Sequence, residues 1–273
     1  MNIAHMKIAF LGGGNMASAI LEGCIKQGLN PAMCHVVEIN PERCAYLKQE
    51  YGVNTHETIT SEIADCTLIL LAVKPQNMQE IAEILSTYLK KAVTPIIMSI
   101  AAGIPLAKLS LWLNHYPRII RAMPNMAALV HASMTGLAAL PTVSEEERSC
   151  AEKLMMTIGD VLWLSDEAQL DAVTAVSGSG PAYVFYFIEA LQKAGELLKL
   201  SPQQAHQLAL KTFEGASRLA LSSLEPVDIL RKRVTSKGGT TEAAIQHLDD
   251  TQTKKNFIEA VQAANNRSKE LGK

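Results

Sequence analysis

The sequence predicts an α/β fold in which a doubly wound parallel sheet is followed by an all-α region. Two observations predict it. From Lys7 to about Ile100, short apolar runs alternate with helical patterns, which is typical of a parallel sheet covered by helices on both faces. After Asp166, helix-length patterns follow one another with almost no strand-like run. We therefore expect one domain over residues 1–165 and a second, helical domain over residues 166–273.

The expected strands are rich in Val, Ile and Leu on both faces, as strands buried between two helix layers must be. The runs are KIAFLG, HVVEI, TLILLAV and PIIMSI, and weaker runs that extend the sheet are Arg118–Ala122, Thr135–Leu140 and Val161–Leu164. Apolar residues at helical spacing, or a proline at the first helical position, predict helices between the strands. These helices are Asn15–Gln27, Pro41–Glu50 and Pro75–Leu89.

The second domain is expected to consist of helices alone, over residues 167–176, Pro181–Leu200, Pro202–Leu221, Pro226–Val234 and about Thr253–Leu271. The segment PAYVFYFIEALQKAGELLKL is apolar around much of its girth, more than a small helical domain covers by itself. We therefore expect a homodimer or higher homo-oligomer that forms through the C-terminal helices.

Composition excludes several classes of function. The chain has 273 residues, 48% of them hydrophobic, and a net charge of -2, which gives no electrostatic footprint for nucleic acid or an anionic membrane. No segment approaches the roughly 18 apolar residues of a membrane helix, and the N-terminus lacks the features of a signal peptide. The five cysteines show no CxxC pair and no histidine-rich spacing, so we expect no metal site, no disulfide framework and a cytoplasmic protein.

The first predicted strand runs into GGGNMA, a G-x-G-x-x-A pattern at a strand-to-helix junction. Gly12 permits the tight turn, Gly14 lets a pyrophosphate approach the backbone, and Ala17 lets the helix pack close to the strand. The N–H groups at the helix start, around Asn15 and Met16, are favourable for phosphates. A glycine-rich turn without a ligand is the alternative. The βαβ context favours a dinucleotide site, and hence a Rossmann-type domain over residues 1–165.

Further cofactor residues are expected where other strands end. Glu38 lies near the place where an acidic residue accepts hydrogen bonds from the adenosine ribose, and an ordinary solvated carboxylate is the alternative. Ligands of doubly wound sheets collect outside the carboxyl ends of the strands, although ordinary turns are equally compatible with these segments. The remaining candidates are Asn40, Ala72, Val73, Lys74, Pro75, Ala101, Ala102, Gly103 and Asn125. Near Asn125, Arg121 is either a structural ion pair or a substrate contact.

β-Hydroxyacid dehydrogenases also join a sheet domain to a helical domain. They carry a second glycine motif, G-x-G-x-x-x-K-x-x-x-N, whose lysine is the general acid or base for the alcohol. The corresponding segment here begins at Gly178, and Val184 and Ile188 stand in the lysine and asparagine positions. Since these side chains do not move protons, alcohol oxidation lacks its base at that position.

Six separated blocks resemble the pyrroline-5-carboxylate reductase family and cover nearly the whole chain: FLGGGNMASAI, LLAVKPQ, SIAAGI, IIRAMPNMAALV, AVSGSGPAYVF and VTSKGGTTEAAI. The resemblance implies hydride transfer from NADPH or NADH to the cyclic imine Δ1-pyrroline-5-carboxylate, giving L-proline in the last step of proline biosynthesis. It also implies that the helical domain, residues 166–273, serves dimerisation and carries the substrate loop. A dinucleotide-sensing protein without chemistry is the alternative, but such a protein has no reason to keep the VTSKGGTT segment.

The resemblance also implies that this segment holds the substrate carboxylate, with Thr241 close to the ring nitrogen. Backbone N–H groups at a glycine pair before a helix start can converge on one anion. The imine needs a proton on nitrogen, and the hydroxyl of Thr241, backed by water, is the catalytic candidate; if the imine arrives protonated, Thr241 only positions it. The expected substrate-binding residues are Ser236, Gly238, Gly239, Thr240 and Thr241. The family usually has proline at position 237, where Lys237 is either a solvent-facing replacement or an added cation near an anion.

The strand end around Glu38 favours NADH over NADPH. A carboxylate accepts hydrogen bonds from the ribose hydroxyls of NADH and repels the 2′-phosphate of NADPH. Ile39 supplies no cation where phosphate-binding versions often have arginine. Asn40 and Arg43 are close enough in sequence to reach a phosphate, so we expect the exclusion of NADPH to be incomplete.

Overall fold

The computed structural model describes residues 3–89 and 94–272. The chain divides into two compact units, and each is described by itself. Unit 1 comprises Met1–Ser179 with Ala264–Lys273, and unit 2 comprises Gly180–Ala263. The sequence predicts a boundary between two functional domains at residues 165 and 166. This boundary stays a prediction, because compactness alone does not say where a functional domain begins.

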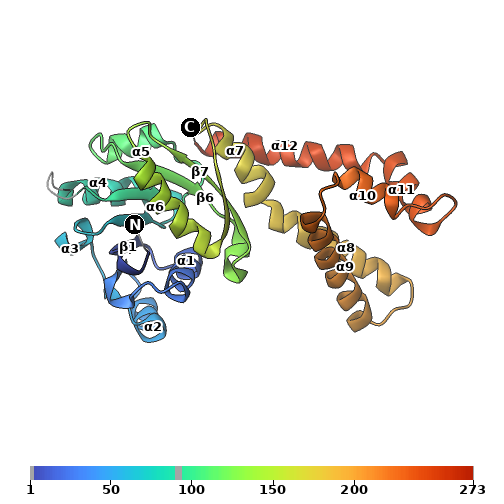
Figure 1. Cartoon of the computed structure of the whole chain (residues 1–273), viewed down its shortest axis with the longest axis horizontal. Coiled ribbons are helices and arrows are strands. Elements are labelled where there is room, and N and C mark those ends of the chain that lie inside the picture. The colour runs from blue at the N-terminus through green and yellow to red at the C-terminus, as the bar shows by residue number, and fades with distance from the viewer. Residues whose placement is uncertain (1–2, 90–93, 273) are drawn as a thin grey trace. The chain divides into compact units, whose positions relative to one another are not determined.

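Unit 1 contains a β-sheet, in which Figure 1 labels β1, β6 and β7. Within the described residues the sheet has eight strands in the order β3-β2-β1-β4-β5-β6-β7-β8. The strands β1 to β6 run parallel to one another in this sheet. The predicted doubly wound α/β class is therefore confirmed. The strands are β1 Ile8–Leu11, β2 Cys34–Val37, β3 Asn54–His56, β4 Leu68–Leu71, β5 Ile96–Ser99, β6 Ile119–Met123, β7 Ser133–Ala139 and β8 Gly159–Trp163.

The sheet departs from the sequence-based expectation at two strands. β3 has the short polar sequence NTH, which carries none of the apolar signal that predicted the other strands. β7 runs antiparallel to β6 although the rest of the sheet is parallel. The connection between them spans only residues 124–132, and a parallel crossover needs a dozen or more residues, so the chain turns back instead.

Two hydrophobic cores lie on the two faces of the sheet. Alternate residues of β1 point to opposite faces, with Ile8 and Phe10 in one core and Ala9 and Leu11 in the other. The first core is covered by α1 Asn15–Lys26, α2 Pro41–Tyr51 and α6 Glu145–Met155. The second is covered by α3 Ser61–Ala64, α4 Met78–Tyr88 and α5 Leu106–Trp112. Burial on both faces explains the uninterrupted apolar runs of the central strands.

Short helical segments connect these elements. The 3₁₀ segments are η1 Ile3–His5, η2 Pro31–Met33, η3 Pro75–Asn77, η4 Met126–Val130 and η5 Met156–Ile158. Near the end of unit 1, α7 Gln169–Val173 continues into the π-helical turn η6 Thr174–Gly178. The sequence predicted one short helix over residues 167–176, close to α7 and η6.

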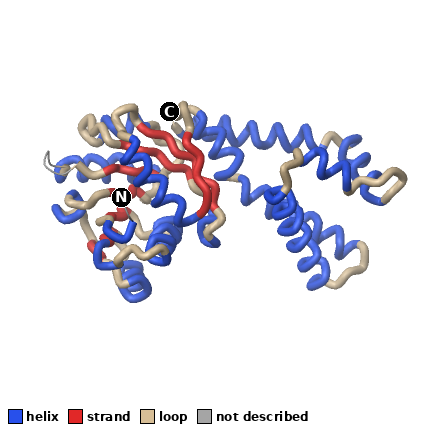
Figure 2. Tube along the Cα trace, in the orientation of Figure 1, coloured by secondary structure: helices blue, strands red, loops and turns tan. Residues whose placement is uncertain are grey.

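Unit 2 is all-helical: Figure 2 colours its segments only as helix and loop. Its helices are α8 Gly180–Leu197, α9 Pro202–Ser222, α10 Val227–Arg233, α11 Thr240–Asp250 and α12 Thr253–Leu271, the last of which ends in unit 1. Gly195 of α8 lets α9 approach closely, because a Cβ there would lie 3.0 Å from the Cβ of Ala205. In the described part of the chain, no helix combines the length and the hydropathy that spanning a bilayer requires.

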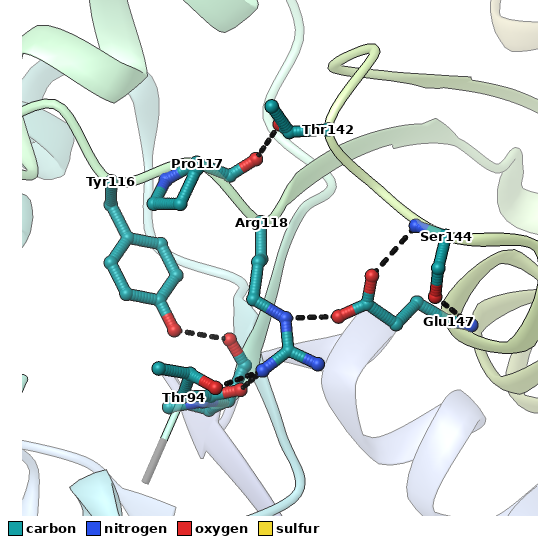
Figure 3. A network of polar contacts seen from close by, with 8 residues as sticks. Thr94, Tyr116, Pro117, Arg118, Thr142, Ser144 and Glu147 are labelled. Carbon is teal, nitrogen blue, oxygen red and sulfur yellow. Dashed lines mark hydrogen bonds and ion pairs between the residues drawn. The ribbon is translucent and has the colours of Figure 1, made fainter. Parts of the chain in front are cut away.

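A polar network joins the amino ends of β5 and β6 to α6, at the sheet edge opposite the carboxyl ends (Figure 3). Arg118 donates to the carboxylate of Glu147 and to both oxygens of Thr94. The second carboxylate oxygen of Glu147 accepts the N–H of Ser144 at 2.7 Å, and Ser144 caps the N-terminus of α6. This network clamps the first turn of α6 onto the sheet.

Candidate active site

The glycine turn after β1 is tightly packed on one side and open on the other. Gly12 has φ +101°, and a Cβ there would lie 2.7 Å from the carbonyl oxygen of Ala72 at the end of β4. Gly14 is the N-cap of α1, and no described atom lies within 4 Å of the position its Cβ would occupy. Ala17 is buried in the first turn of α1. The backbone at the start of α1 is thus open to a pyrophosphate, as the sequence pattern predicts.

Glu38 follows β2, and its carboxylate anchors this turn. Oε2 accepts the N–H of Gly13 at 2.9 Å, and Oε1 accepts the N–H of Asn40 at 3.0 Å. A carboxylate offers about four acceptor positions, so the side chain keeps capacity for ribose hydroxyls. The anchoring contact was not foreseen from the sequence, because hydrogen bonding to the middle glycine of the motif leaves no sequence pattern.

A cleft of about 510 Å³ opens at the carboxyl ends of β1, β2 and β4. The apolar side chains of Ile39, Ile59 and Ile81 contribute to its lining. Six of the predicted cofactor residues also line it: Gly12, Gly14, Glu38, Ala72, Val73 and Lys74. The structure therefore brings together the glycine turn, the acidic residue and the segment after β4, which the sequence places far apart.

The other predicted cofactor residues lie outside this cleft. Asn15 and Met16 form the start of α1, Pro75 begins η3, and Ala101 and Ala102 follow β5. The side chain of Asn40 caps α2 through hydrogen bonds from the N–H groups of Glu42 and Arg43. Gly103 has φ +77°, and a Cβ there would lie 3.1 Å from the Cβ of Leu271 at the end of α12. Close packing is thus one physical reason for glycine at position 103.

Asn125 uses its side-chain amide within the protein. Its Nδ2 donates to the carbonyl of Ser177 at 2.9 Å, and its Oδ1 accepts the N–H of Ala127 at 3.0 Å. Arg121, in the same segment, forms an ion pair with Glu167, which is the structural alternative left open by the sequence. Both residues therefore tie the end of β6 to the segment that leads out of unit 1.

Arg43, which the sequence leaves within reach of a cofactor phosphate, lies against the glycine turn. Its Nε donates to the carbonyl of Gly13 at 2.7 Å, its Nη2 donates to the hydroxyl of Ser18 at 2.6 Å, and the guanidinium lies over the ring of Tyr46. The neighbouring Cys44 donates its thiol to the carbonyl of Glu38. Burial raises the pKa of Cys44, so the thiol stays protonated and serves as a donor. Side chains of α2 thus hydrogen-bond to the glycine turn, to α1 and to the residue that follows β2.

In unit 2, the segment Ser236–Thr241 forms a turn that leads into α11. Gly238 has φ +73°, and its N–H donates to the carboxylate of Glu242 at 2.7 Å. The N–H of Gly239 donates to the carbonyl of Ser236 at 3.0 Å. The first N–H groups of a helix have no intrahelical acceptor, so those of Thr240 and Thr241 are directed outward at the start of α11. Lys237 is exposed.

Comparison with known proteins decides the family. Residues 167–271 match the family described as pyrroline-5-carboxylate reductase dimerisation, and residues 7–103 match the family described as NADP oxidoreductase coenzyme F420-dependent. A pyrroline-5-carboxylate reductase of Pseudomonas aeruginosa is 42% identical over 266 residues, covering 97% of this chain and 96% of that protein. The chain belongs to the pyrroline-5-carboxylate reductase family. The resemblance seen in the sequence is thereby confirmed, and the hydroxyacid dehydrogenase alternative is set aside.

Solved structures of the family have the same fold. The reductase from Coxiella burnetii has a TM-score of 0.92 at 39% identity and covers 98% of this chain and 99% of its own. A pyrroline carboxylate reductase from Plasmodium falciparum, solved with NADP bound, has a TM-score of 0.87 at 27% identity and covers 99% of each chain. The family model over residues 167–271 supports a homo-oligomer, and the model over residues 7–103 supports NAD(P) binding in unit 1.

Proposed function

We propose that the protein reduces Δ1-pyrroline-5-carboxylate to L-proline, with a nicotinamide cofactor bound at the cleft of unit 1. The observation that carries the proposal is the full-length relationship to reductases of this name, together with the GGTT segment at the start of α11. The glycine turn fits the cofactor because the backbone at Gly14 is open and the N-terminus of α1 faces the same side. When bound, the reduced cofactor supplies the hydride that reaches the imine carbon.

The loop of unit 2 is the proposed carboxylate site. Glu242 places a carboxylate oxygen on the N–H of Gly238, and this contact supports an anion-binding role for the turn. Since the N–H groups of Gly238 and Gly239 have acceptors within the loop, we assign the main backbone contacts to Thr240 and Thr241. Ser236, Gly238 and Gly239 shape the turn, since a Cβ at Gly239 would lie 2.6 Å from the hydroxyl of Ser236.

Thr241 is the proposed catalytic residue of the loop. Its hydroxyl donates or relays the proton that the ring nitrogen needs as the imine carbon accepts hydride. Thr241→Val should lower kcat by roughly 10- to 1,000-fold, a range at or somewhat below the usual contribution of a general acid. Thr241→Ser should restore most of it, and Thr240→Val is the matched neighbour that keeps its backbone N–H. A Thr241→Val enzyme with unchanged kcat and only a raised KM would reduce the residue to a binding role.

The assay follows consumption of NADH or NADPH with pyrroline-5-carboxylate, set beside oxidation of a hydroxyisobutyrate-type alcohol by the oxidised cofactor. We expect turnover with the imine and none with the alcohol, because Val184 and Ile188 provide no base. Turnover of the alcohol alone would overturn the proposal.

The described thiols form no disulfide, and we infer a reducing compartment, the cytoplasm. We further infer that the oligomer forms through α8 and α9, whose apolar side chains are largely exposed in the single chain.

NADH is the cofactor that the cleft favours in this proposal. Glu38 presents negative charge at the end of β2, and Ile39, which is 82% exposed, supplies no cation. Arg43 is bonded to Gly13 and Ser18 rather than directed at a 2′-phosphate. We expect NADH to have the higher kcat/KM, and Glu38→Gln with Ile39→Arg to shift the ratio toward NADPH. A wild-type preference of tenfold or more for NADPH would show that Glu38 does not select the cofactor.

A further inference from the structure

The edge of the sheet in unit 1 carries a cluster of ligand atoms outside the cofactor cleft. His35 is the second residue of β2, His56 is the last residue of β3, and Glu62 lies in α3. Nδ1 of His35 is 3.0 Å from Nε2 of His56, and the two rings are stacked with planes 19° apart. One ligand atom from each of the three side chains lies within 4.8 Å of the others.

The fold places these side chains together by strand pairing. β2 and β3 are parallel neighbours, with Val37 opposite His56, so His35 and His56 lie on the same face of the sheet at diagonal positions. His35 is 7% exposed, His56 is half-buried and Glu62 is exposed. The two imidazole rings therefore lie toward the protein interior, and the carboxylate of Glu62 lies toward solvent.

We propose that His35, His56 and Glu62 form a binding site for a divalent transition metal, with Zn²⁺ as the reference ion and water as the fourth ligand. Two imidazole nitrogens and one carboxylate oxygen are a donor set that zinc uses in proteins, whereas Mg²⁺ and Ca²⁺ prefer oxygen ligands alone. Zn–N bonds of about 2.0–2.1 Å in a tetrahedral arrangement hold the two nitrogens roughly 3.3 Å apart. The observed 3.0 Å separation therefore needs to open by a few tenths of an ångström, and the rings need to turn so that both lone pairs face the ion instead of each other.

The protonation states are compatible with this role. In the metal-free pair, one ring nitrogen donates its N–H to the other ring. Moving that proton to the other nitrogen of the same ring leaves both facing nitrogens with lone pairs, so binding requires no net loss of a proton. Lys7, whose Nζ contacts the carbonyl of Glu62 at 3.4 Å, opposes a bound cation, and the carboxylate of Glu62 offsets this charge.

The site lies one hydrogen bond from the cofactor cleft. The carbonyl of His56 accepts the N–H of Glu38 at 2.9 Å, and Glu38 in turn anchors the glycine turn. A metal that fixes His56 therefore also restrains the residue that faces the cofactor. The sequence predicts no metal site, because the two histidines lie on different strands without a metal-ligand spacing in the chain.

The test uses the full-length protein after treatment with a chelator. Co²⁺ serves as the spectroscopic probe and Zn²⁺ is titrated by calorimetry, with Mg²⁺ as the control ion. We expect one equivalent of Co²⁺ per chain with the visible absorption of a four-coordinate site, displaced by Zn²⁺ and not by Mg²⁺. Glu62→Gln alters an exposed side chain and should weaken Zn²⁺ binding at least tenfold, the lower end of what loss of even an outer-shell partner costs.

Matched variants separate this site from general surface binding. His115→Asn removes an exposed histidine elsewhere in unit 1, with a residue that tolerates its positive φ, and Glu50→Gln removes an exposed carboxylate. Both should keep the wild-type affinity. The proposal is overturned if wild-type protein binds Zn²⁺ no more tightly than the His56→Gln/Glu62→Gln double variant, or if the control variants weaken binding as much as Glu62→Gln.

Discussion

Replacement of Glu147 by glutamine tests how strongly the polar network of Figure 3 holds α6 on the sheet. The side chain of Glu147 is 10% exposed, and its two carboxylate oxygens accept from Arg118 and from the N–H of Ser144. Glutamine keeps the shape but has only one acceptor oxygen, so one of these two contacts must be lost.

The expected loss of stability follows from these contacts. A hydrogen bond to a charged group contributes about 1.5–3 kcal/mol to stability. Arg118 is 31% exposed and recovers part of its solvation from water, so the lower half of this range applies. We therefore expect Glu147→Gln to lower the free energy of unfolding by about 1.5–2 kcal/mol at neutral pH. Glu145→Gln is the matched control, since Glu145 lies in the same first turn of α6 with a side chain that is 96% exposed.

Tryptophan fluorescence during urea unfolding is the suitable measurement. Both tryptophans of the chain, Trp112 in α5 and Trp163 in β8, belong to unit 1, so the signal reports on this unit. The midpoint should fall for Glu147→Gln and stay near wild type for Glu145→Gln. Equal effects of the two variants would show that charge at the start of α6, rather than the network, stabilises the unit.

The pH dependence gives a second check. Burial alone would raise the pKa of Glu147, but the hydrogen bonds from Ser144 and Arg118 outweigh it and lower the pKa below the ordinary 4.5. A lowered folded-state pKa contributes stability that is complete above the unfolded pKa and is lost as the pH falls through the folded pKa. The difference between wild type and Glu147→Gln should therefore be largest at neutral pH and shrink in acid below about pH 4.5. A difference that does not change with pH would refute this account.

Two further predictions concern the cofactor turn and the helices of unit 2. Gly12→Ala introduces a Cβ 2.7 Å from the carbonyl oxygen of Ala72 at φ +101°, so it should lower stability by about 1–3 kcal/mol and also weaken NADH binding. Gly14→Ala should weaken NADH binding alone, because the space around its Cβ is open. Thermal unfolding and fluorescence titration with NADH separate the two effects, and identical behaviour of the two variants would contradict the assignment. Phe185→Glu, on a side chain 63% exposed in α8, should dissociate the oligomer in light scattering, and Glu50→Lys, an exposed position in unit 1, is the control. An active wild-type monomer would refute it.

The patterns of apolar residues along the chain made most of the fold predictable. The central strands are buried on both faces, so their apolar runs stand out. A proline at the first helical position marks the starts of α2 and α9. β3 and the direction of β7 were not predictable in the same way. The first has three polar residues, and the second depends on a connection that is too short for a crossover. These features follow from the geometry of the assembled sheet rather than from local preference.

The candidate site was predictable where backbone requirements select the residue type. Gly12 and Gly14 stand out because a turn and a helix N-terminus need them. Contacts from a side chain to a distant part of the backbone were not predictable in the same way. Arg43 donates to the glycine turn across 30 residues of sequence, and Glu242 reaches back to Gly238, yet neither residue type at its position marks such a contact. The sequence therefore predicted three of the backbone segments that line the cleft, whereas the contacts that side chains make required the structure.

Glu38 shows why cofactor preference and stability are coupled in this chain. The same carboxylate that would face the ribose accepts the N–H of Gly13, which is buried. Replacing Glu38 with serine would make room for a 2′-phosphate, but it leaves the N–H of Gly13 without its acceptor. An unsatisfied buried donor lowers the stability of the fold by about 1–3 kcal/mol. Glutamine retains one oxygen for Gly13 and gives up the contact with the N–H of Asn40, which is exposed and hydrogen-bonds to water instead. It therefore removes the charge while the buried N–H keeps its acceptor. A change of cofactor preference at position 38 is therefore interpretable only when the glycine turn keeps its acceptor.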